Sequence, residues 1–110
     1  MILNIGIIEI GLKKWRVNMK KTNGLFLLNE NLNTLIKWIN EENEINKKEH
    51  IKVAQIKSRQ TALTLYSVGA LTFNQWEFMD GYIKKLVKKE TTAEDRLKAY
   101  EIVEDGIKEV

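Results

Sequence analysis

One histidine and four nearby glutamates are the side chains best suited to acid–base or metal chemistry. His50 follows Glu49, and Glu41, Glu42 and Glu44 precede them by a few residues. Carboxylates can hold a hard cation, but this cluster lacks the alternating Asp/Asn pattern and the glycine of a calcium loop. A histidine that moves protons needs convergent partners, which the sequence does not supply. We interpret the cluster as a solvated acidic helix end and expect no metal site and no cofactor.

The sequence contains no motif of a known catalytic site. It has no Gly-rich phosphate loop, no nucleophile elbow and no paired-histidine motif. It also has no cysteine, which excludes disulfides and thiolate chemistry and is typical of a reducing cytoplasm. We therefore expect a protein that is not an enzyme.

Three basic residues and one glutamine with helical spacing are the candidate nucleic-acid face. They are Lys48, Lys52, Gln55 and Arg59. A helix-turn-helix would also bring Asn74 and Gln75 to base edges. However, no basic residue follows them before Lys84, and phosphate neutralisation dominates DNA affinity. A helix-turn-helix DNA-binding regulator is therefore the alternative function, and the net charge of +3 is too small to favour it.

A ring flanked by lysines is the candidate protein contact. Phe78 lies beside the main apolar arc of its predicted helix, and the candidate residues are Phe78, Tyr82, Lys85 and Lys89. An apolar centre with a charged rim is typical of an interface anchor. We expect the partner to be another protein or a second copy of this chain.

Helical periodicity dominates the sequence from residue 29 onward. The first predicted helix begins at Asn29 or Asn31, carries apolar residues three and four apart, and frays from Asn43 to Asn46. The second predicted helix runs from Lys48 to Val68. Residues 61–68 are rich in β-branched side chains, so a strand is the alternative there.

Two capping signals delimit the remaining helices. Gly69 suits a helix C-terminus, and Thr72 with Gln75 forms a capping box, which predicts a tight corner at 69–72. The third helix then runs from Phe73 to Lys89. Its apolar arc comprises Phe73, Trp76, Met79, Tyr82, Ile83, Leu86 and Val87. A second box, Thr91 with Glu94, predicts that the last helix begins at Thr91 or Thr92.

The first eighteen residues differ from the rest. The apolar run from Ile2 to Leu12 suits a strand or an arm, and it is too short to span a bilayer. The codons of Trp15, Arg16 and Val17 can form a purine-rich ribosome-binding sequence before Met19. We therefore predict that Met19 is the translation start and that residues 19–110 form a single helical domain.

Length and composition agree with one small domain. The chain has 110 residues, 44% of them hydrophobic and 30% charged, so it can bury a modest core. We expect an all-α bundle of about four helices. Because the residues favour A/T-rich codons, we expect a phage or mobile-element accessory protein in a bacterial cytoplasm. Its expected role is interaction or regulation, which includes inhibition of a host system.

Overall fold

The protein is described by a computed structural model that covers the backbone of residues 2–42 and 45–108 and the side chains of residues 21–42 and 45–107. Four helices make up this described part, which contains no strand: α1 (Ile2–Asn40), α2 (Lys47–Ser67), α3 (Phe73–Lys88) and α4 (Ala93–Lys108). The predicted all-α fold of four helices is confirmed.

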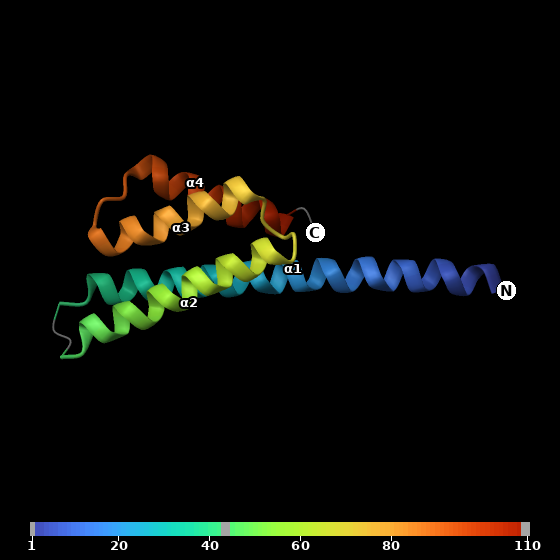
Figure 1. The fold of residues 1–110 in the computed structure, drawn as a ribbon, viewed down its shortest axis with the longest axis horizontal. Helices are drawn as coiled ribbons and strands as arrows, with labels where there is room; N and C mark the ends of the chain where they lie inside the picture. Colours follow the sequence, from blue (N-terminus) through green and yellow to red (C-terminus); the bar gives the residue numbers. More distant parts are fainter. Residues whose placement is uncertain (1, 43–44, 109–110) are drawn as a thin grey trace.

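The helices form two antiparallel pairs. Figure 1 shows α2 running back along α1, with α3 and α4 lying together on one side of that pair. The N-terminal part of α1 extends beyond the other helices. A helix of 39 residues is about 58 Å long at 1.5 Å per residue. The length of α1 therefore accounts for most of the longest dimension of the molecule, 65 Å.

The core lies where all four helices meet. α1 contributes five residues with heptad spacing: Leu25, Leu28, Leu32, Leu35 and Ile39. α2 contributes mostly small residues, among them Ala54, Ser58 and Ala62, so it packs closely on α1. The buried residues of α3 are Met79, Tyr82, Ile83 and Leu86, and those of α4 are Ala99, Ile102 and Val103. Each large apolar side chain buried here stabilises the fold by about 1.5–3 kcal/mol.

The predicted beginning of the first helix is wrong. Residues 2–18 are helical and continue into the rest of α1, so the predicted strand at this end is also wrong. Leu25 and Leu28 are fully buried and keep the heptad spacing, so the helix has no reason to begin at Asn29. Gly24 lies within this helix without interrupting it. A Cβ at Gly24 would lie 2.5 Å from Cδ2 of Leu65 on α2. The close crossing of the two helices therefore uses this glycine.

The connection between α1 and α2 is only partly described. The predicted fraying from Asn43 to Asn46 lies in part outside the described residues, because residues 43 and 44 are not among them. α1 ends at Asn40 and α2 begins at Lys47. The predicted second helix is confirmed, including residues 61–67, where the strand alternative is wrong.

The corner between α2 and α3 is confirmed in detail. Gly69 has a φ of 79°, a backbone conformation in which a residue with a side chain would be strained. Its N–H donates to the Tyr66 carbonyl at 3.0 Å, and the Ala70 N–H donates to the Leu65 carbonyl at 2.8 Å. These two bonds form a Schellman motif. Thr72 then caps α3: its N–H donates to Gln75 Oε1 at 2.9 Å, and its hydroxyl accepts from the Gln75 N–H at 3.2 Å.

The second capping box lies one residue later than predicted. The Thr92 N–H donates to Asp95 Oδ2, and the Thr92 hydroxyl accepts from the Asp95 N–H, both at 3.1 Å. Because α4 begins at Ala93, Thr92 is the N-cap and Asp95 is the third helical residue. The predicted pair of Thr91 and Glu94 is therefore wrong.

Candidate functional site

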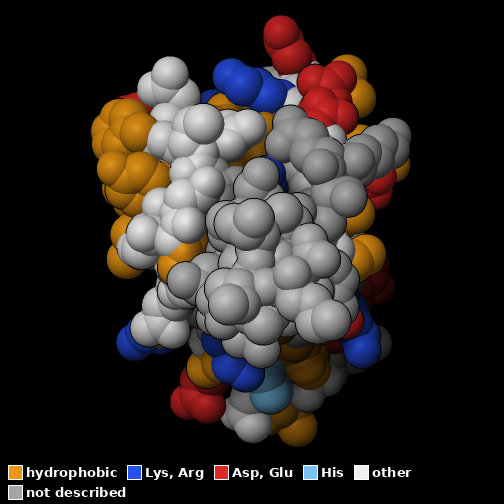
Figure 2. Space-filling view, turned by 90° about the vertical axis from the view of Figure 1, so that its right-hand side faces the viewer, with side chains coloured by type: hydrophobic (Ala, Val, Ile, Leu, Met, Phe, Trp, Pro, Cys, Tyr) orange, Lys and Arg blue, Asp and Glu red, His pale blue; other side chains and the backbone are white. Residues whose placement is uncertain are grey.

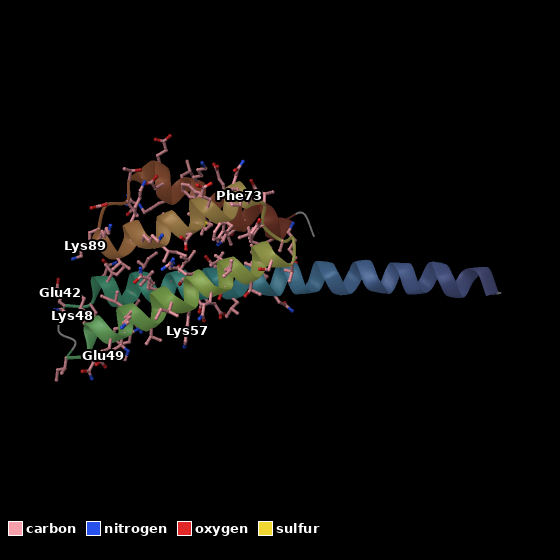
Figure 3. All side chains as sticks on the ribbon, viewed as in Figure 1. Glu42, Lys48, Glu49, Lys57, Phe73 and Lys89 are labelled. Carbon is pink, nitrogen blue, oxygen red and sulfur yellow. The ribbon has the colours of Figure 1, made fainter. Side chains whose placement is uncertain are left out.

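His50, Glu41, Glu42 and Glu49 lie at the end of the bundle where α1 meets α2, and Glu44 lies outside the described residues. Figure 3 shows Glu42 and Glu49 at this end. His50 stacks on Trp38 of α1, with ring centroids 4.0 Å apart and planes within 7°. Within the described ranges, no three acidic or histidine side chains lie close enough together to hold a metal ion. The geometry thus gives His50 a packing contact between two helices.

The predicted nucleic-acid face is tied to α3 at one end. Lys48 and Lys52 are exposed, while Gln55 is half-buried. Arg59 donates from Nε to Oδ1 of Asp80 at 2.8 Å, which links α2 to α3. In Figure 1, α3 runs back along α2 as in a helical hairpin. DNA binding by this face stays a prediction, with Lys48 and Lys52 as its most accessible cations.

Asp80 is the hydrogen-bond acceptor in the ion pair between α2 and α3. Burial raises the pKa of its carboxyl, but hydrogen bonds from Arg59 and Lys84 outweigh that effect. The Lys84 ammonium lies 3.2 Å from Oδ2 of Asp80. The pKa of Asp80 is therefore lower than its ordinary value. The ion pair stays formed at neutral pH and fixes α3 against α2.

The predicted protein-contact residues do not form one open patch. Tyr82 is only 5% exposed, and burial raises the pKa of its hydroxyl. Phe78 is half-buried against the core, and Nζ of Lys98 on α4 lies 4.5 Å from its ring centroid. Lys85 is exposed and pairs with Asp95 at 3.5 Å. Lys89 is exposed beyond the end of α3. A partner contact through these four residues stays a prediction, but only the two lysines are well exposed.

A different apolar surface lies along α2 and the corner, and we call it the corner patch. Its members are Ile56, Leu63, Tyr66 and Phe73. All four are exposed, Phe73 to 51%. The Tyr66 and Phe73 rings meet edge to face at 5.9 Å, and Tyr66 stacks on the half-buried Trp76 at 5.3 Å. Figure 2 looks along the molecule from the side of the N-terminus and shows hydrophobic side chains on both flanks, with the largest group at the upper left.

Sequence reasoning missed the corner patch. Phe73 and Trp76 belong to the predicted apolar arc of the third helix, which is an expectation of burial. The available signal was that Ile56, Leu63 and Tyr66 recur seven and three residues apart. That spacing puts them on one face, whereas the buried face of α2 consists mainly of small residues.

A groove of about 860 Å³ lies between α1 and α2 on another side of the molecule, and we call it the α1–α2 groove. Its lining residues are Lys21, Gly24, Leu27, Asn31, Lys57, Gln60, Thr61, Thr64, Leu65, Val68, Gly69 and Ala70. Asn31 donates to the Thr61 hydroxyl across its floor at 2.9 Å. Leu27 and Val68 are exposed, Val68 to 67%. Lysines are the only charged residues among those that line it.

No helix of the described chain is both long enough and apolar enough to cross a membrane. No protein family, no curated protein and no solved structure compared with this chain matches it.

Proposed function

We propose that this protein is a small regulatory interaction protein, without catalytic activity of its own, that binds a protein partner through the corner patch. The observation that carries the proposal is the set of exposed apolar side chains on α2 and at the start of α3. Contiguous exposed apolar surface is costly in water and is typical of interaction sites.

The chemistry of the corner patch suits a protein partner. Tyrosine and other aromatic residues are enriched at the centres of interfaces, where they act as anchors. Tyr66 and Phe73 already contact each other and Trp76, so the rings are partly ordered before binding. Such pre-organisation reduces the entropy lost on association.

The cellular setting is part of the proposal. The cysteine-free sequence and the A/T-rich codon preference support a bacterial cytoplasm and a phage or mobile-element origin. Regulation or inhibition of a host protein would then require only a binding surface, which the corner patch provides.

The test is comparative affinity purification from the native host with quantitative mass spectrometry. Phe73→Ser removes one ring of the corner patch, and Phe26→Ser removes an equally exposed ring on α1, since each is 51% exposed. We expect Phe73→Ser to reduce a co-purifying protein at least tenfold, whereas Phe26→Ser leaves it near the wild-type amount. Thermal melts of both variants check that each is folded before the recoveries are compared.

Two results would contradict the proposal. If both folded variants recover every partner in equal amounts, the corner patch does not take part in binding. Retention of the purified protein on DNA, with an affinity that falls steeply as salt rises and is lost in Lys48→Glu, favours the DNA-binding alternative.

A further inference from the structure

The two helices of the bundle that do not contact each other in the described part of the chain, α2 and α4, carry opposite charge. α2 has five basic residues and one acidic residue, whereas α4 has five acidic residues and three basic ones. Within the described residues, α2 and α4 do not touch each other, because α1 and α3 separate them. Their outer surfaces therefore point away from each other. Because these opposite charges partly cancel, the net charge of the chain is only +3.

The outer face of α4 is apolar at its centre and acidic at its edge. Leu97 is 58% exposed and Tyr100 is 61% exposed, and the two lie three residues apart on one face. The glutamates that share this face are Glu94, Glu101 and Glu104. We call these five residues the α4 face. An exposed leucine and tyrosine within one helical turn suit insertion into a groove.

The α1–α2 groove has the complementary chemistry. Leu27, Leu65 and Val68 supply apolar surface, and the charged lining residues are both lysines. Figure 3 shows Lys57 on the side of α2 that is turned away from α3 and α4. No carboxylate is among the described residues that line the groove. An acidic amphipathic helix fits this arrangement better than a neutral or basic one.

We propose that the α4 face of one copy of this protein docks into the α1–α2 groove of a second copy. Leu97 and Tyr100 enter the groove, and glutamates of α4 lie near Lys57. Since the two surfaces differ and lie on opposite sides of the bundle, the contact is head-to-tail. Each added copy leaves one groove and one α4 face unoccupied, so association continues into open chains or closes as a ring. The contact uses no residue of the corner patch, so it is independent of the proposed function.

Sedimentation velocity of the full chain over a range of concentrations tests this contact. We expect wild-type protein to form species larger than dimers, with association that weakens as salt rises. Lys57→Glu blocks the groove, and Leu97→Ser with Tyr100→Ser blocks the α4 face. Each variant alone is expected to be monomeric, with a dissociation constant raised at least tenfold.

Mixing the two variants is the decisive measurement. The groove variant keeps an intact α4 face, and the α4 variant keeps an intact groove. Their mixture is therefore expected to form a heterodimer that grows no further. A symmetric contact between like surfaces gives no such rescue. Glu101→Lys provides a second block of the α4 face if the double variant does not fold.

Two controls separate this contact from other effects. Lys88→Glu makes the same charge change at an exposed lysine of α3, outside the groove, and is expected to associate as wild type does. Leu63→Ser with Phe73→Ser removes two of the four corner-patch side chains and is also expected to associate normally. If the wild-type protein is monomeric at all concentrations, the proposal is wrong. The groove would then be a candidate site for an acidic helix of another protein. Loss of association in the corner-patch variant, or failure of the mixture to form a heterodimer, also overturns the proposal.

Discussion

Lys89 adopts a backbone conformation that is usual for glycine. Its φ is 59°, and its N–H donates to the Leu86 carbonyl at 3.1 Å, while the Glu90 N–H donates to the Lys85 carbonyl at 3.0 Å. The end of α3 thus repeats the Schellman motif of α2, but with lysine in the place of Gly69. A left-handed conformation costs an ordinary L-residue roughly 1–2 kcal/mol.

We expect Lys89→Gly to raise the free energy of unfolding by about 1 kcal/mol, because it relieves this strain at a small cost in chain entropy. Lys88→Gly is the matched control. Lys88 is the last residue of α3, so glycine there should destabilise the protein by about 0.5–1 kcal/mol. Urea unfolding with an unchanged slope measures both variants. Destabilisation by both would show that Lys89 pays no conformational penalty.

Asp80 gives the protein a pH-dependent link between α2 and α3. Burial raises the pKa of Asp80, but its hydrogen bonds to Arg59 and Lys84 lower the pKa more, so the folded value lies below the ordinary 3.8. A depressed folded pKa contributes stability that is fully present above the unfolded pKa. That stability is lost as pH falls through the folded pKa.

We therefore expect Asp80→Asn to lower the free energy of unfolding at neutral pH by up to about 1 kcal/mol, the scale of an ion pair whose cationic side chains are about half-exposed. The difference from wild type should shrink as pH falls below 3.8. Urea unfolding at several pH values measures it. Glu77→Gln is the control, since Glu77 is exposed on the same helix. A difference that stays constant with pH would mean that the lost link is not electrostatic.

At the scale of single elements, the start of α4 depends on one of two adjacent threonines. We expect Thr92→Ala to lower the free energy of unfolding by about 1 kcal/mol, because the N-cap hydroxyl that accepts from Asp95 is lost. Thr91→Ala should change stability by less than about 0.5 kcal/mol, as changes away from a cap usually do. Thermal unfolding compares the pair. The opposite order would place the start of α4 one residue earlier.

Local signals predicted the corner between α2 and α3, since every group in it lies within a few residues of its partners. Gly69, Thr72 and Gln75 meet through the backbone of one short segment, and their types determine the motif. The start of α1 could not be read in the same way. Asn29 is a good capping residue, but burial of Leu25 and Leu28 by other helices extends α1 past it. Tertiary packing overrides a local signal in such cases.

At the scale of the whole molecule, the exposure of a side chain depends on contacts between helices, which the periodicity of one helix does not predict. Periodicity placed Phe73 in the apolar arc of α3, yet it lies in the first turn and remains half-exposed. Phe78 lay outside that arc, yet it packs against the core with Lys98 of α4 over its ring. The α1–α2 groove also joins residues far apart in sequence, such as Leu27 and Val68. The sequence therefore predicted the helices, whereas the exposure of these side chains depends on how the helices pack together.

The N-terminal part of α1 supports the last prediction, which concerns the whole molecule. Figure 1 shows this part of the helix extending beyond α2, α3 and α4. The buried residues of α1 within the described side chains begin at Leu25. A chain that begins at Met19 keeps all of them. We therefore expect it to unfold at the same temperature as the full chain and with the same cooperativity.

A chain that begins at Asn29 is the control, because it lacks Leu25 and Leu28, which are both fully buried. Loss of one buried leucine side chain costs about 2–5 kcal/mol, so loss of both should remove most of the stability of a small domain. Circular dichroism during thermal unfolding compares the three chains. Destabilisation of the Met19 chain by several degrees would show that residues 2–18 contribute to the fold. An unchanged midpoint, together with a native protein whose measured mass begins at Met19, would confirm the predicted translation start.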